Sequence, residues 1–110
     1  MKGVALNQVI HMAFIIFEVK SDQVGKINTL VKDDLVSRQS ILTRDAESLD
    51  LKGEVTFVKI EGSDAGLHRA EDIAKELGFT KLKEKKATEI NKKIQEQEDS
   101  AADGLGMIFD

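Results

Sequence analysis

Two segments of the chain are apolar on both faces that an extended backbone presents. In residues 13–20 (AFIIFEVK) and residues 54–61 (EVTFVKIE), hydrophobic side chains occupy both the odd and the even positions. Runs of this kind are typical of central strands that are covered on both sides. The pattern therefore predicts two strands in the interior of a sheet.

Helical spacing follows the first of these strands. Over residues 21–35, apolar positions recur mostly at intervals of three and four, which predicts one buried helical stripe. The stripe consists of Val24, Ile27, Leu30, Val31 and Leu35. Ser21 is the expected N-cap, and Gly25 indicates either a late helix start or close packing.

A second helix is expected after residues 54–61. Ser63 or Asp64 is its predicted N-cap, and Gly78 stands where a left-handed residue ends a helix. The buried stripe between them consists of Leu67, Ala70, Ile73, Ala74 and Leu77. Residues 53–78 thus predict a continuous unit of strand, turn and helix.

The segment between the two units is less regular. Residues 40–51 predict a strand with a turn or bulge at residues 45–48, after which Leu49 and Leu51 resume the alternation. A hairpin turn is expected over residues 50–53, because its last residue is a glycine that can adopt positive φ.

The last quarter of the chain predicts a strand and a helix. Residues 79–85 (FTKLKEK) are short and highly charged, which is typical of an edge strand. The last helix is expected to start at Thr88 and to be broken by residues 103–106 (DGLG). An apolar tail, residues 107–109, follows.

The predicted order of elements is β-α-β-β-α-β and a further helix, which is the ferredoxin-like arrangement of the α+β class. Its usual strand order places residues 13–20 and 54–61 side by side in the centre, in agreement with their two apolar faces. Three segments are expected: an N-terminal extension (1–12), a ferredoxin-like domain (13–86), and a C-terminal helix with an apolar tail (87–110).

Two helices cover only one face of such a sheet. The other face should carry Phe14 or Phe17 together with Val58 and Ile60, and an apolar face of this size needs a cover. Either the C-terminal segment from Thr88 folds back over it, or a second subunit packs there. We expect a dimer in which the C-terminal segment also contributes.

Composition narrows the chemistry that the fold could carry. The length of 110 residues suits one domain, and the net charge of -4 argues against a general nucleic-acid binder, which must neutralise phosphates. The chain has no cysteine, and His11 and His68 are far apart in sequence, so zinc is not expected. Clustered carboxylates could take calcium loosely, but none matches an EF-hand loop, and no cofactor is predicted. Abundant Lys and Glu without Pro or Cys are compatible with a thermophilic source.

The most apolar stretch, residues 4–17, predicts no membrane partner. It is too short to cross a bilayer and is interrupted by polar side chains. No signal-peptide cleavage site follows it. A cytoplasmic location is therefore expected.

A first candidate ligand site comes from a resemblance. The segments IIFEVKSDQVGKINTLVKDDL and VTFVKIEGSDAGLHRAEDIAKELGF resemble the two halves of ACT-like and NIL-like regulatory domains, over residues 13–85. Such families bind small metabolites, often amino acids, at dimer interfaces near the first strand–helix turn. The residues that the resemblance implies are Ser21, Asp22, Gln23, Val24 and Gly25.

A second candidate site lies at the opposite end of the predicted sheet. Serines and basic residues gather there around a helix N-terminus, which can hold a carboxylate or phosphate. These residues are Ser37, Arg38, Ser40, Ser63, His68 and Arg69. The ordinary alternative is that Ser63 and Asp64 cap the helix while the arginines are solvated, and this alternative is favoured.

No catalytic motif is recognisable in the sequence. The leading hypothesis is a small, dimeric, non-catalytic ferredoxin-like module that binds a small metabolite or a protein partner. One alternative is an assembly protein that docks on another subunit through its C-terminal segment. The other is a small enzyme that uses Arg38, Arg44 or His68 at an anion site.

Overall fold

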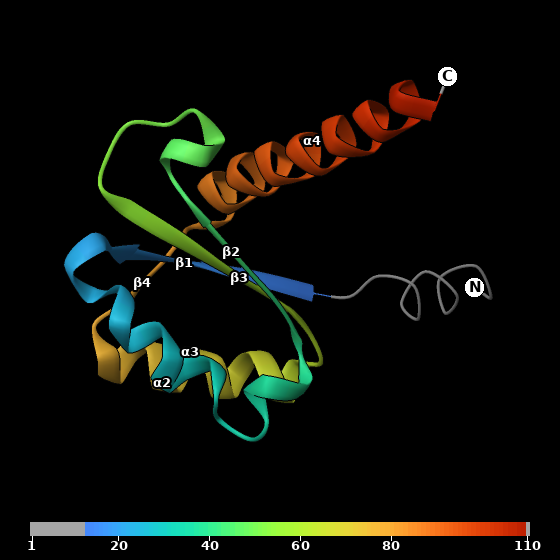
Figure 1. Ribbon diagram of the computed structural model, residues 1–110. Coiled ribbons are helices and arrows are strands. Elements are labelled where there is room, and N and C mark those ends of the chain that lie inside the picture. Colours follow the sequence, from blue (N-terminus) through green and yellow to red (C-terminus); the bar gives the residue numbers. More distant parts are fainter. Residues whose placement is uncertain (1–12, 110) are drawn as a thin grey trace.

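The computed structural model describes residues 13–109, with side chains described for residues 13–99. The predicted N-terminal extension, residues 1–12, lies outside the described residues. The predicted α+β class is confirmed, because the described chain forms a four-stranded antiparallel sheet and three α-helices. Helices lie on both faces of the sheet (Figure 1).

The two predicted central strands occupy the centre of the sheet. The strands are β1 (Ala13–Lys20), β2 (Ser40–Asp45), β3 (Val55–Gly62) and β4 (Thr80–Lys81). Their order is β2-β3-β1-β4, and every neighbouring pair is antiparallel. β1 and β3 pair along their whole length, with Phe17 opposite Val58. This order is compatible with the predicted ferredoxin-like arrangement.

The helices differ in length and type. The α-helices are α2 (Ile27–Val31), α3 (Asp64–Leu77) and α4 (Glu84–Phe109). Three short 3₁₀ helices are η1 (Ser21–Lys26), η2 (Val36–Arg38) and η3 (Glu47–Leu49). α2 and α3 lie on one face of the sheet, and α4 lies on the other (Figure 1).

The face beneath α2 and α3 forms the first hydrophobic core, which we call the α3 core. Its buried members are Ile15, Phe17, Val19, Leu30, Val36, Val58, Ile60, Leu67, Ala70, Ile73, Ala74 and Phe79. The stripe predicted for the second helix is therefore buried, with Leu77 partly so. The ends of α3 are also as predicted: Gly66 N–H donates to Ser63 Oγ at 3.1 Å, and Gly78 has a φ of 81°.

The opposite face forms a second core, the α4 core. Its buried members are Ile16, Ala46, Leu49, Phe57, Leu82, Ala87, Ile90 and Ile94. Phe14, Leu42, Leu51 and Val55 pack against it and are partly buried. The C-terminal helix thus covers the second face, which was one of the two predicted covers. The prediction that Phe17, Val58 and Ile60 lie on this second face is wrong, because all three belong to the α3 core.

The first predicted helix is wrong in its start and in its stripe. Residues 21–26 are 3₁₀, the α-helix begins only at Ile27, and no side chain caps either segment. Val24 is 42% exposed rather than buried. The stripe that packs on the sheet therefore begins at Ile27, with the α-helix, and does not include Val24. Gly25 precedes the α-helix, in line with a late start.

The irregular strand is also shorter than predicted. β2 ends at Asp45, and the chain then turns through η3 and does not resume the strand. Ala46 and Leu49 are buried because this turn directs them beneath α4. The expected backbone freedom at Gly53 is confirmed by its φ of 114°.

The C-terminal elements differ most from the prediction. β4 has two residues, Thr80 and Lys81, instead of seven, and α4 begins at Glu84, before Thr88 and before the expected boundary at residue 87. The predicted break at residues 103–106 is wrong, since the helix continues to Phe109. A glycine costs a helix about 1 kcal/mol and does not by itself end it.

Candidate functional site

The first predicted ligand site lies on an exposed turn. Ser21, Asp22, Val24 and Gly25 are exposed on η1, and Gln23 is half-buried. The turn is fixed to the loop before β3, because Ser21 N–H donates to the Glu54 carbonyl at 2.9 Å. These five residues are thus consecutive members of one short 3₁₀ helix.

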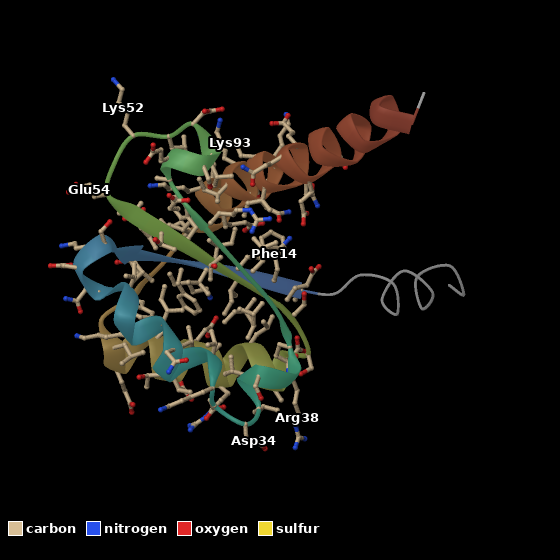
Figure 2. The ribbon with its side chains drawn as sticks, viewed as in Figure 1. Phe14, Asp34, Arg38, Lys52, Glu54 and Lys93 are labelled. Carbon is tan, nitrogen blue, oxygen red and sulfur yellow. The ribbon has the colours of Figure 1, made fainter. Side chains whose placement is uncertain are left out.

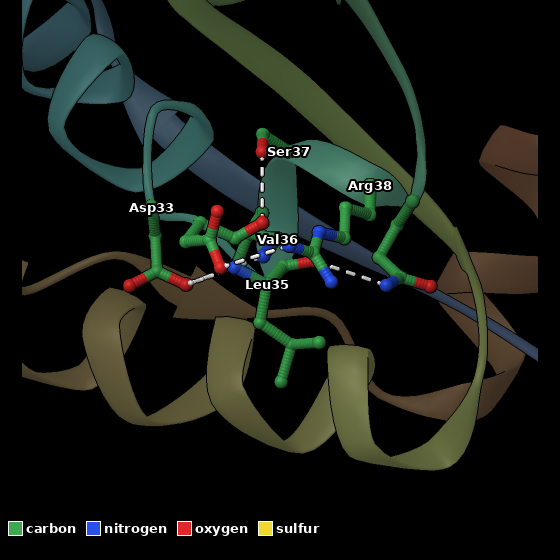
Figure 3. A network of polar contacts seen from close by, with 7 residues as sticks. Asp33, Leu35, Val36, Ser37 and Arg38 are labelled. Carbon is green, nitrogen blue, oxygen red and sulfur yellow. Dashed lines mark hydrogen bonds and ion pairs between the residues drawn. The ribbon is translucent and has the colours of Figure 1, made fainter.

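The second predicted site has its two arginines paired with neighbouring carboxylates. Arg38 Nη2 lies 3.3 Å from Asp34 Oδ2, and Arg69 Nη2 lies 3.0 Å from Asp33 Oδ1. Ser37 Oγ donates to the Asp34 carbonyl at 2.9 Å (Figure 3). An anion at this position would have to compete with these carboxylates.

Ser40, Ser63 and His68 take separate positions around that network. Ser40 begins β2 and is exposed, and Ser63 is occupied as the N-cap of α3. His68 is exposed and forms no side-chain hydrogen bond or ion pair within residues 13–99. Ser63 thus caps α3, as the ordinary alternative predicts, whereas the arginines that it predicts to be solvated lie beside carboxylates.

Asp33 is the central acceptor of this end of the sheet. Besides Arg69, its Oδ2 accepts from the backbone N–H groups of Leu35 at 3.1 Å and Val36 at 3.2 Å. The hydrogen bond from Arg69 lowers the pKa of the Asp33 carboxyl, and the N–H of Val36 acts in the same direction. The same pair raises the pKa of Arg69. The arrangement ties η2 to α3.

Gln39 closes the remaining space at this end, and sequence reasoning missed it. Its Nε2 donates to the Leu35 carbonyl at 3.0 Å, and its Oε1 accepts from Ser63 N–H at 3.0 Å. A Cβ atom added to Gly62 or Gly66 would collide with the Gln39 side chain. The available signal was the pair of glycines flanking Ser63, which permits a close approach.

A hollow beside β1 is the largest of the concave sites described here. β4 pairs only with Phe17 and Glu18; Leu82 N–H then donates to the Ile16 carbonyl at 2.9 Å, and the chain turns away into α4. The hollow left there has a volume of about 460 Å³. It is lined by Ala13, Phe14, Ile15, Ile16, Lys81, Leu82, Glu84, Ala87 and Thr88. We call it the β1-edge hollow.

The lining of the β1-edge hollow is apolar inside and polar at three positions. Phe14 lies between the sheet and α4 (Figure 2), and it is only half-buried. Lys81, Glu84 and Thr88 are the polar members. The sequence did not reveal this site, because a strand running to residue 85 would have filled it.

Polar contacts also join α4 to β2 and η3. Arg44 Nε donates to Gln97 Oε1 at 2.7 Å, and Gln97 Nε2 donates to the Ser48 carbonyl at 2.6 Å. Lys59 Nζ lies 5.2 Å from the centre of the Phe14 ring. Gln97 therefore bridges β2 and η3 to the helix.

The described part of the chain gives no sign of a metal site or a membrane span. Among residues 13–99, no three potential ligand side chains from His, Asp or Glu converge. No helix in the described region combines the length and the apolar character that a membrane crossing requires.

Comparison of the sequence with protein-family models and with curated proteins, and of the structure with solved structures, finds no significant match.

Proposed function

We propose that this chain is a ferredoxin-like binding module, without catalysis of its own, that recognises an extended segment of a protein partner at the β1-edge hollow. The strand order β2-β3-β1-β4 and the position of α2 and α3 on one face support the ferredoxin-like assignment. The observation that carries the functional proposal is the incomplete pairing of β1 by the two-residue strand β4.

The backbone of β1 offers hydrogen-bonding groups at this edge. The N–H and C=O groups of alternate residues point to the same side of a strand. Since the Ile16 carbonyl accepts from Leu82, the N–H and C=O of Phe14 point to the same edge, where β4 does not extend. An added strand could pair with Phe14 as peptides do when they extend a sheet.

The hollow supplies a place for a partner side chain. Its walls include Phe14, Ile16, Leu82 and Ala87, which suit an apolar side chain, and burying one such side chain is worth about 1.5–3 kcal/mol. Backbone pairing would give affinity, and the hollow would give specificity.

A small metabolite is the second candidate occupant of the same site. The volume of about 460 Å³ falls in the range of about 300–1,000 Å³ that small-molecule pockets occupy. An apolar group of the metabolite would enter the hollow, and Lys81 or Glu84 would contact a polar group. No geometric observation favours an enzyme, since Arg38 and Arg44 already have side-chain partners and His68 stands apart.

The test is a titration of the ¹⁵N-labelled protein with extended peptides of alternating valine and threonine. We expect amide shifts centred on Phe14, Leu82 and Ala87. Thr88→Trp, which fills the mouth of the hollow, should abolish them, whereas Lys85→Trp on the exposed side of α4 should not. A parallel thermal-shift panel of amino acids, nucleotides and pterins tests the metabolite. The absence of any response at the hollow to both panels would contradict the proposal.

A further inference from the structure

The strand β2 forms the longer of the two edges of the sheet. Among residues 13–109 it pairs only with β3, so the side of β2 that faces away from β3, which we call the β2 edge, is open along six residues. The strand has the sequence SILTRD, without proline and with its charged residues only at its end. An open edge of this kind is a template on which another strand can pair.

The groups that β2 presents at this edge follow from its pairing with β3. Ala46 N–H donates to the Val55 carbonyl at 2.9 Å. Alternate residues of an antiparallel strand bond to the same neighbour, so every second residue before Ala46 also bonds to β3. The residues between them direct their N–H and C=O groups to the β2 edge. These residues are Ile41, Thr43 and Asp45.

Side chains of the same chain bond to two of the three outward carbonyls. Arg44 Nη1 donates to the Thr43 carbonyl at 2.8 Å. Ser48 Oγ donates to the Asp45 carbonyl, also at 2.8 Å. A strand added here would need these carbonyls as acceptors, and it would have to displace or bury the guanidinium of Arg44. Burying a charge without a partner is unfavourable.

Gln97 of α4 holds both donors at the β2 edge. Its Oε1 accepts from Arg44 Nε at 2.7 Å, and its Nε2 donates to the Ser48 carbonyl at 2.6 Å. Gln97 and Arg44 are both half-buried. One side chain of α4 therefore fixes Arg44 and also the η3 turn, which carries Ser48.

The edge of β1 has no such donor. The Phe14 carbonyl, which points to that edge, accepts no side-chain hydrogen bond from residues 13–99. The two edges thus differ in kind: the longer one is occupied by a cationic side chain and a hydroxyl, and the shorter one is free of both.

We propose that Arg44 and Ser48, positioned by Gln97, close the β2 edge to strand addition and so direct an extended partner segment to the edge of β1. The closure of the β2 edge is independent of any partner, whereas the choice of β1 rests on the proposed function of the β1-edge hollow. Arg44 and Ser48 determine specificity by excluding a pairing that the longer edge would otherwise offer.

The test removes both donors in the double variant Arg44→Ala/Ser48→Ala. The ¹⁵N-labelled variant is titrated with the same peptides of alternating valine and threonine. We expect amide shifts at Ile41, Thr43 and Asp45 that the unmodified protein does not show. Shifts at these amides in the unmodified protein, or their absence in the folded variant, would overturn the inference. Shifts at β1 are read separately, so a failure of the proposed function is distinguishable.

A matched control and a milder variant exclude a general loss of stability. Ser37→Ala/Arg38→Ala removes the same residue types from η2, where both contact Asp34, and should produce no shifts in β2. Ser48→Ala alone changes an exposed side chain. It should produce the shift at Asp45 even if the double variant does not fold, and the absence of that shift would likewise overturn the inference.

A proline tests whether the new binding is strand pairing. Thr43→Pro, added to the double variant, removes an outward N–H at an edge position, where proline is tolerated in a strand. It should abolish the shifts at Ile41 and Asp45. Shifts that persist would show that the peptide binds in another way, and would contradict the inference.

Gln97→Ala tests the positioning of the donors by α4. We expect peptide-induced shifts at Thr43 and Asp45, because Arg44 and the η3 turn lose their common partner. Gln95→Ala, at an exposed position of the same helix, should produce none. A β2 edge that stays closed in Gln97→Ala would refute the positioning role of Gln97.

Discussion

The two faces of the sheet are covered by helices whose positions are determined in different ways. α3 follows directly from β3, begins at a capping serine and ends at a left-handed glycine. α4 begins without such a turn after a two-residue strand, and contacts with β1, β3 and η3 place it. The α3 layer is therefore specified locally, whereas the α4 layer depends on side chains far away in sequence.

The largest expected effect comes from the centre of the α4 core. Ile94 is fully buried, and Ile94→Ala should lower the free energy of unfolding by about 3 kcal/mol, through lost apolar contact and a cavity. Chemical denaturation measures the change. Leu30→Ala, at a fully buried position of the α3 core, is the matched comparison and should cost a similar amount.

The two variants should differ in what they expose. Only Ile94→Ala should increase binding of a hydrophobic dye, because α4 is held mainly by this core and can separate from the sheet. A change below about 0.5 kcal/mol for Ile94→Ala, the range of an ordinary surface substitution, would show that α4 does not cover the second face.

A smaller effect is expected at the end of the sheet that Gln39 closes. Gly62→Ala should destabilise the fold by about 1–2 kcal/mol, because the added Cβ displaces Gln39 from its bonds to Ser63 and Leu35. Thermal or chemical denaturation measures the loss. Gly25→Ala is the control, since no atom beyond its own chain neighbours lies within 4 Å of the added Cβ, and it should change stability little. Equal effects of the two substitutions would refute the close approach.

The polar bridge to α4 should contribute less. Gln97→Ala removes the bonds to Arg44 and Ser48 and should cost about 1 kcal/mol. Gln95→Ala, an exposed position on the same helix, should be neutral. If both variants unfold at the same denaturant concentration, the bridge does not stabilise the α4 layer.

The smallest effect is a dependence of stability on acid at the α3 layer. The pKa of Asp33 is lowered in the folded protein, so its contribution is present above the unfolded value of 3.8 and is lost as pH falls through the folded value. Denaturation midpoints from about pH 5 to about pH 2 should fall less steeply for Asp33→Asn than for the unmodified protein. Identical slopes would contradict the role given to the Arg69 contact.

The same contrast explains which features the sequence predicts. The central strands, the α3 stripe, Ser63 and Gly78 are correct because local pattern and capping chemistry determine them. The length of β4, the start of α4 and the continuity of α4 were predicted incorrectly. They depend on the pairing of β1 with Thr80 and Lys81 and on packing in the α4 core. Val24 was misplaced because its spacing from Ile27 does not show where the segment begins to pack on the sheet.

The candidate site was less predictable than the fold. The predicted arginines Arg38 and Arg69 lie at one end of the sheet, but Asp34 and Asp33 pair with them, and Gln39 bonds to Ser63 beside them. The β1-edge hollow arises where a strand stops early, and residues 79–85 have a strand-like composition throughout. A site that depends on the end of a strand is therefore not visible in a residue pattern.

The open edge of β1 is tested most directly by amide hydrogen exchange at Phe14 and Ile15. Ile15 pairs with Ile60 of β3, whereas the Phe14 N–H points to the edge that no strand among residues 13–109 pairs. We predict rapid exchange at Phe14 and slow exchange at Ile15 in the free protein, with protection of Phe14 when an extended peptide binds. Equal protection of the two amides in the free protein, unchanged by any peptide, would contradict the account.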